Sequence, residues 1–197
     1  PRMCEAIGMY IAALEWNPTH QPQAIERLKQ LMPRAPGQLM PIEDSSQWLD
    51  LTGNAQIKND LVEATGDTPS MQFSAPPDQD ASALITSSPI SVQPNTLFEI
   101  SGWVKSSSIY GSGYGVVTVF EDDGNWGHGR TTDLISVDET HGWLPFRVTL
   151  TTLPTTQRLF VRQGLFNTFG TFWVDGIHLV QVAPQVVTPL VKLPPCK

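Results

Sequence analysis

Two glycine-rich segments, residues 106–115 and 121–130, carry the side chains best suited to binding chemistry in this chain. The first contains two tyrosines, and the second contains a tryptophan flanked by acidic, amide and guanidinium groups. A flat aromatic ring packs against the apolar C–H face of a sugar ring, and polar groups around it replace water at the hydroxyls. A tryptophan between glycines in a polar loop is poorly placed for a core, which favours exposure at an interaction surface. We therefore predict a carbohydrate-binding site made of Tyr110, Tyr114, Trp126, Asp123, Asn125 and Arg130.

Catalytic patterns are missing from the sequence. The four histidines fall at no metal-ligand spacing, and neither a nucleophile elbow nor a phosphate-binding loop occurs. Nothing nominates a particular pair of carboxylates for glycoside hydrolysis. The acidic cluster at residues 121–123 offers oxygen ligands for a structural calcium ion. It lacks the ordered ligand pattern of a calcium loop, so a solvated turn is the favoured interpretation. We expect no catalysis, no metal site and no cofactor.

Composition narrows the class of partner. The formal net charge is −7 and no basic stripe is present, which argues against nucleic acid, because phosphate neutralisation needs clustered Lys and Arg. Charged residues make up 16% of the chain, and Ser, Thr, Gly and Pro are plentiful. That balance is typical of loop-rich β proteins outside the cytoplasm. No apolar stretch is long enough to span a bilayer. The chain begins at Pro1, so we interpret it as a fragment or processed product with an extracytoplasmic location (secreted, periplasmic or cell surface).

The elements expected to position the aromatic loops are β-strands. Residues 97–105 and 170–179 alternate β-branched and aromatic residues with small or polar ones. Many short strands separated by turn signals predict a mainly β, antiparallel sandwich or jelly roll over residues 47–183. Segment 106–115 is then a flexible hairpin. The strands are expected near 47–52, 56–64, 69–75, 82–91, 96–106, 114–121, 132–137, 143–152, 157–166 and 169–182.

The two ends of the chain differ from the β region. Residues 1–32 show helical spacing in two segments, and Pro33, Pro36, Gly37 and Pro41 mark residues 33–46 as a linker. Residues 184–197 are Pro-rich, which predicts an extended tail. Cys4 and Cys196 lie near opposite ends, and two unrelated thiols are favoured over a disulfide between them.

The helical segment has the residue pattern of a repeat protein. Ala6, Tyr10, Ala13 and Pro18 match the spacing of the second helix of a tetratricopeptide repeat. The segment therefore resembles the end of such an array, which would dock onto a protein complex. An ordinary helical hairpin packed on the sandwich is the alternative.

Three pieces of the β region stand in an order that resembles a known family. Phe98–Lys105, Trp143–Thr149 and Phe172–Leu179 resemble strands of the jelly-roll carbohydrate-binding modules attached to cellulases and xylanases. The resemblance covers residues of about 48–182 and implies a galactose-binding-like sandwich. In that family the residue equivalent to Asp175 often supports an ion or a loop, and a hydrogen-bonded turn at Asp175–Gly176 is the favoured interpretation here. Trp103 and Trp173 are expected to pack in the core, with a groove-lining position as the alternative for Trp103 if its sheet face is the concave one.

Two functions from different classes follow. The first is a non-catalytic glycan-binding module of a larger secreted or envelope protein. The second is an assembly subunit whose sandwich and helices dock onto a protein complex, because aromatic residues are enriched in protein interfaces as well as in sugar sites.

Overall fold

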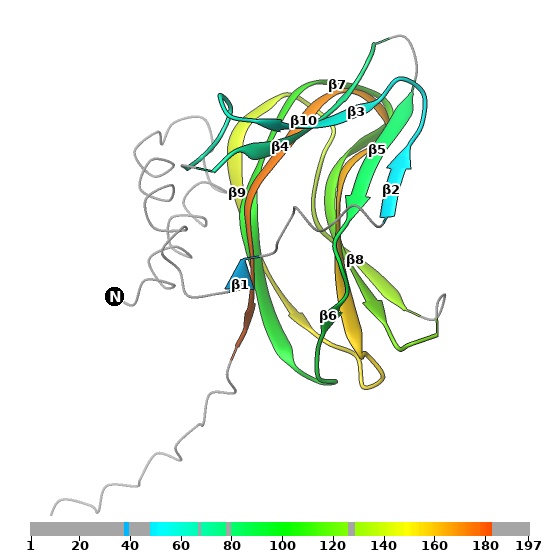
Figure 1. Cartoon of the computed structure of the whole chain (residues 1–197), viewed down its shortest axis with the longest axis vertical. Coiled ribbons are helices and arrows are strands. Elements are labelled where there is room, and N and C mark those ends of the chain that lie inside the picture. Colours follow the sequence, from blue (N-terminus) through cyan, green and yellow to red (C-terminus); the bar gives the residue numbers. More distant parts are fainter. Residues whose placement is uncertain (1–37, 40–47, 67, 78–79, 126–128, 183–197) are drawn as a thin grey trace, which may run out of the picture.

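The computed structural model describes residues 38–39, 48–66, 68–77, 80–125 and 129–182. This part is mainly β: its strands form one curled antiparallel sheet, and none of its residues is helical (Figure 1). A membrane-spanning helix is accordingly not found among the described residues. The predicted helical hairpin, most of the linker, the tail, both cysteines and Trp126 lie outside them. The strands are β1 Gln38–Leu39, β2 Trp48–Leu51, β3 Gln56–Asp60, β4 Ser70–Ala75, β5 Ala81–Thr86, β6 Ile90–Ser91, β7 Leu97–Asp122, β8 Arg130–Val137, β9 His141–Thr151 and β10 Arg158–Gln181.

The fold is organised by one long ribbon of β7 and β10. The two strands pair antiparallel from Phe98↔Gln181 to Asp122↔Arg158, with two register shifts where the ribbon bends and a third between Asp175 and His178. On one side of the bend, the order is β2, β5, β10, β7, β8; we call this the groove half. On the other side, the order is β3, β4, β10, β7, β9; we call this the far half. Two strands thus belong to both halves of a sandwich, which confirms the mainly β antiparallel prediction.

The core lies between the two halves. Alternation along each strand sends every second side chain inward, so residues such as Phe73, Val104, Val117, Leu165 and Phe172, all fully buried, form one hydrophobic cluster. Burial of one such side chain contributes roughly 1.5–3 kcal/mol relative to leaving it exposed. The core therefore uses the inner face of each half.

The prediction of a hairpin at residues 106–115 is wrong, because this segment continues β7 through the bend. Glycine signals a turn, but inside a strand it equally marks a bulge or a close approach of two backbones. Gly113 shows the second case, since an added Cβ would lie 1.7 Å from the carbonyl oxygen of Phe166. Residues 157–166 and 169–182 are likewise one strand, β10, rather than two.

The outer face of the far half carries two buried tryptophans. Trp103 and Trp173 are 1% and 8% exposed, yet neither belongs to the central hydrophobic cluster. The Trp173 ring donates from Nε1 to Asp60 Oδ2 at 3.0 Å, and the Lys105 ammonium lies 5.0 Å from the ring centroid. That hydrogen bond, with the backbone N–H of Glu63, lowers the pKa of Asp60. The loop after β3 is therefore fastened to this face.

Asp175–Gly176 forms a bulge inside β10 and not the hydrogen-bonded turn that was favoured. The register shifts between Asp175 and His178, and Gly176 has a φ of 57°. Asp175 is buried and its Oδ2 accepts hydrogen bonds from both the backbone N–H and the hydroxyl of Thr65, each at 2.6 Å. The carboxylate supports the loop after β3 directly.

A buried histidine gives the fold a pH dependence. His178 is 5% exposed, its Nδ1 has no hydrogen-bond partner among the described residues, and burial lowers its pKa. The unfolded chain, with an ordinary pKa of about 6.5, takes up a proton that the folded protein resists. Stability should be full above about pH 6.5 and decline as the pH falls below it.

Urea unfolding at pH 5 and pH 8 should show this decline in the wild type, and His178→Gln should reduce it. The half-exposed His141 supplies the control, since His141→Gln should retain the decline. Equal pH dependence in the wild type and in H178Q would contradict the assignment.

Candidate functional site

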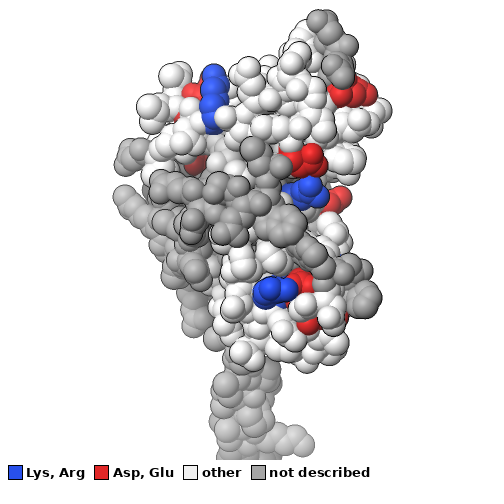
Figure 2. Space-filling view, turned by 45° about the vertical axis from the view of Figure 1, so that its right-hand side comes forward, with Lys and Arg blue, Asp and Glu red and all other residues white. Residues whose placement is uncertain are grey.

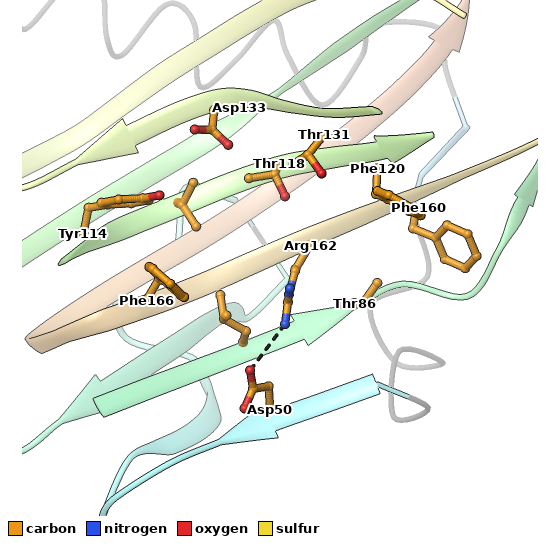
Figure 3. A pocket seen from close by; sticks show the side chains of 12 residues that line it. Asp50, Thr86, Tyr114, Thr118, Phe120, Thr131, Asp133, Phe160, Arg162 and Phe166 are labelled. Carbon is orange, nitrogen blue, oxygen red and sulfur yellow. Dashed lines mark hydrogen bonds and ion pairs between the residues drawn. The ribbon is translucent and has the colours of Figure 1, made fainter. Parts of the chain in front are cut away.

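An open groove of about 590 Å³ lies on the outer face of the groove half (Figure 3). Its walls come from all five strands of that half. Alternate positions line it, as the strand period of two requires: Tyr114, Val116, Thr118 and Phe120 on β7, and Phe160, Arg162 and Phe166 on β10. The remaining lining residues are Asp50, Leu84, Thr86, Thr131 and Asp133.

An aromatic pair stands at each end of the groove. Tyr114 and Phe166 are ladder partners, with ring centroids 5.8 Å apart and planes tilted by 46°. Phe120 and Phe160 are ladder partners too, with centroids 6.2 Å apart and a tilt of 42°. Six residues separate the pairs along each strand, which corresponds to about 20 Å at the usual rise of an extended chain. The groove is therefore elongated, with an aromatic pair at either end (Figure 3).

The floor between the aromatic pairs is apolar and low. In one cross-strand row, Gly164 of β10 stands between Val116 of β7 and Leu84 of β5, which are 4% and 2% exposed. Gly164 has a φ of 137°, and an added Cβ would lie 1.9 Å from the carbonyl oxygen of Ala83. Only glycine fits this backbone conformation without strain. Position 164 therefore accepts only glycine, and the buried side chains of Val116 and Leu84 form the floor on either side of it.

Charged and hydroxyl groups line the walls. Arg162 and Asp50 form an ion pair at 3.4 Å with both side chains nearly half exposed, so each has donor or acceptor capacity left for a ligand. Asp133 stands on β8 at the opposite edge of the half. The lining has one cation and two carboxylates, so a polyanion is disfavoured. Figure 2 brings this side of the molecule partly forward, and the described residues that are visible are mostly uncharged, with acidic and basic groups close to one another.

The structure separates the six residues predicted from the sequence. Tyr114 lines the groove. Tyr110 is 61% exposed and packs on Phe169 with centroids 5.8 Å apart, outside the groove lining. Asp123 and Asn125 lie in the β7–β8 turn, where the Asp123 carboxylate accepts from the Asn125 backbone N–H at 2.8 Å. Arg130 begins β8, and Trp126 lies outside the described residues. A sugar contact by any of the six remains a prediction.

The acidic cluster beside that turn is structural. The interpretation of residues 121–123 as a solvated turn is wrong for the first two, since Glu121 and Asp122 are 1% and 0% exposed. Glu121 accepts from Arg130 Nε at 2.5 Å, from the Thr156 hydroxyl and from the Leu153 backbone N–H. Buried carboxylates need such partners, because an unpaired buried charge is costly.

The partner of Asp122 completes this arrangement. Asp122 accepts from Arg158 Nε at 2.8 Å, across the ladder pair that ends the β7–β10 ribbon. Among the described residues, no group of three or more His, Cys, Asp or Glu side chains is arranged to hold a metal ion.

Solved structures share this fold, whereas no family model and no curated protein matches the sequence. A xylan-binding domain of carbohydrate-binding module family 22 is 13% identical, with a TM-score of 0.51 over 73% of this chain and 93% of that one. A family 16 carbohydrate-binding module is 20% identical, with a TM-score of 0.50 over 64% and 86% of the respective chains. These likenesses confirm the predicted resemblance at the level of the fold.

A third structure places the same fold in a larger protein. The enzymatically active domain of tailspike protein 4 from bacteriophage CBA120 is 17% identical, with a TM-score of 0.52. The match covers 73% of this chain but 20% of the tailspike chain. At these identities the comparisons establish architecture alone.

Most of the groove lining was not predicted from the sequence. Phe120, Phe160, Arg162 and Phe166 were assigned to strands without a functional role. Their signal was the alternation itself: one face of residues 114–120 and of 160–166 carries aromatic and polar side chains, while the other face carries core residues such as Val117 and Val161. Neither run is a simple apolar-in, polar-out strand, which indicates a second buried or binding face.

Removal of Arg130 tests its structural role. Arg130→Gln leaves the buried Glu121 carboxylate without its cation, and the pair is partly screened because Arg130 is 40% exposed. We expect a loss of about 1–3 kcal/mol in the free energy of unfolding, measured by chemical denaturation. Arg162→Gln is the matched control. It breaks a pair exposed at both ends and should cost less than about 1 kcal/mol. If both variants lose the same small amount, Arg130 does not stabilise the end of the sandwich.

Proposed function

We propose that this chain is a non-catalytic glycan-binding module of a larger extracytoplasmic protein, and that the groove binds the glycan. The observation that carries the proposal is the combination of an apolar floor, an aromatic pair at each end and hydrogen-bonding groups along the walls. Sugars need both kinds of contact, because their rings have apolar faces and their edges carry hydroxyls.

Each part of the groove then has a defined task. The Phe166 ring is 46% exposed and offers its surface to one sugar ring, with Tyr114 packed against it. Leu84 and Val116 lie under the middle of the bound glycan. Arg162 donates to hydroxyl or ring oxygens, and Asp133 accepts from hydroxyls. At about 20 Å between the aromatic pairs, the groove suits a run of several sugars rather than one.

The positions of the two carboxylates support a binding role over hydrolysis. Asp50 and Asp133 lie on β2 and β8, the two outer strands of the groove half, and three strands separate them. Four strand spacings amount to about 19 Å of sheet, whereas glycosidase carboxyl pairs flank one bond at about 5–10 Å. Figure 3 shows the two side chains on opposite walls.

The ligand class is a neutral polysaccharide. The groove has more negative than positive charge, and its one guanidinium is paired with Asp50. Neutral chains avoid the repulsion that a uronate would meet from Asp133. The fold neighbour described as a xylan-binding domain makes neutral xylan the first polysaccharide to test.

Affinity electrophoresis in gels that contain neutral xylan or β-glucan tests this function. We expect retardation of the wild-type chain, and a loss of about tenfold or more in affinity, roughly 1.4 kcal/mol, for Tyr114→Ala and Phe166→Ala. Thr149→Ala on β9 changes an exposed residue of the far half and should bind as the wild type does. Wild-type mobility that no neutral polysaccharide alters would rule out the glycan-binding function.

A second candidate function, docking onto a protein complex, is favoured by one loop. Leu61 and Val62 follow β3 and are 79% and 89% exposed. The loop is nonetheless firmly held: the Asp60 carboxylate accepts from the Val62 and Glu63 backbone N–H groups, and Glu63 pairs with Lys105 at 2.5 Å. Adjacent exposed aliphatic side chains on an ordered loop are typical of a protein contact.

The double variant Leu61→Asp with Val62→Asp separates the two functions. If assembly is the role, native complexes purified through a tagged chain should lose their partners in this variant and keep them in Tyr114→Ala. Glycan retardation should show the reverse pattern. Partner recovery that is unchanged by the double variant would remove the assembly function from this loop.

A further inference from the structure

The binding surface does not stop at the Tyr114–Phe166 pair. Next to this pair, on the side of the bend, lie Ser112 of β7 and Asn167 of β10. Asp80, immediately before β5, reaches the same place. All three side chains are exposed and come from separate segments of the chain. We call Asp80, Ser112 and Asn167 the bend cluster.

Hydrogen bonds within the bend cluster leave two acceptors unused. The Ser112 hydroxyl donates to Asp80 Oδ2 at 3.0 Å and accepts from Asn167 Nδ2 at 2.5 Å. No hydrogen bond to Asp80 Oδ1 or Asn167 Oδ1 is found among the described residues. The network fixes the orientation of both groups, so each presents an oxygen with little rotational freedom to lose on binding.

The backbone around the cluster allows this arrangement. A Cβ added at Gly111 would lie 2.3 Å from Asp80 Oδ1, so the carboxylate rests against a face that only glycine leaves open. Asn167 has a φ of 47°, a left-handed conformation that asparagine adopts more readily than most other residues with a side chain.

An aromatic platform stands beyond the cluster. Tyr110 is 61% exposed, and its ring packs on Phe169 at 5.8 Å, which limits its motion. Tyr110 and Tyr114 are four residues apart, about 13 Å along a strand. An exposed aromatic residue thus stands on either side of the bend cluster, Phe166 at the groove and Tyr110 beyond it.

We propose that the bend cluster and Tyr110 form a second subsite, which binds the continuation of the same glycan chain after it leaves the groove at Tyr114 and Phe166. Asp80 and Asn167 accept hydrogen bonds from sugar hydroxyls, and the Tyr110 ring packs on a sugar face. This inference rests on the proposed function. It adds that the site is open at this end and binds internal stretches of a long polysaccharide.

Isothermal titration calorimetry with neutral oligosaccharides of increasing length tests the subsite. The probes are a xylo- or gluco-oligosaccharide series from trimer to octamer. Wild-type affinity should rise by about tenfold between chains that fill the groove and chains that extend beyond it. In Tyr110→Ala and in Asn167→Gly, which accommodates the left-handed backbone, that rise should disappear while the affinity for short chains stays unchanged.

Three other outcomes count against the subsite. Equal wild-type affinity for short and long chains overturns it and leaves the groove function standing. A loss in Tyr110→Ala or Asn167→Gly that is the same for short and long chains assigns these residues a structural role, and thermal unfolding of the variants identifies that case. Failure of every oligosaccharide to bind removes the proposed function and this subsite with it.

Discussion

The antiparallel ladder between β7 and β10 is the interaction on which the rest of this structure depends. Every other strand reaches the sheet by pairing with one of these two or with a strand that does. Because the ladder continues on both sides of the register shifts at the bend, the two halves of the sandwich share backbone hydrogen bonds rather than side-chain contacts alone. The outer face of the groove half is therefore a fixed surface, and a ligand meets lining residues whose positions are set before it arrives. Binding to such a preformed site requires little ordering of the protein.

Glycines and buried charges keep the ladder intact where its geometry is most demanding. Gly113 lets the two backbones approach at the bend, and Gly164 lets β10 approach the backbone of β5 beside Ala83. At the opposite end of the ribbon, Glu121 and Asp122 are satisfied by Arg130 and Arg158. The two segments that were predicted to bind sugar thus have two different structural roles. Residues 106–115 shape the bend, while most of the described part of 121–130 fastens the end of the sandwich.

The sequence predicts those features of the fold that depend on local patterns, and it does not predict those that depend on pairing between distant strands. Alternating runs predicted where strands lie, because strand periodicity is local, but they divided β7 and β10 into two strands each. The groove was not predicted, because Asp50, Thr118 and Arg162 come together only through cross-strand pairing. The glycines at 106–115 led to the wrong prediction of a hairpin, because glycine permits either a turn or a bulge and the choice depends on the partner strand. Trp103 was expected to pack structurally and is buried, but on the outer face of the far half, which alternation alone does not distinguish.

The order in which the strands pair affects how the protein folds during its synthesis. β3 with β4 can form early as a local pair, β2 can pair with β5 once both have emerged, and β7, β8 and β9 can pair among themselves. Only β10, residues 158–181, joins these groups. At a synthesis rate of about 5–20 residues per second, the earlier strands wait several seconds on the ribosome with unpaired edges. During that interval the apolar faces of the earlier strands lack the long strand that joins them in the folded sheet.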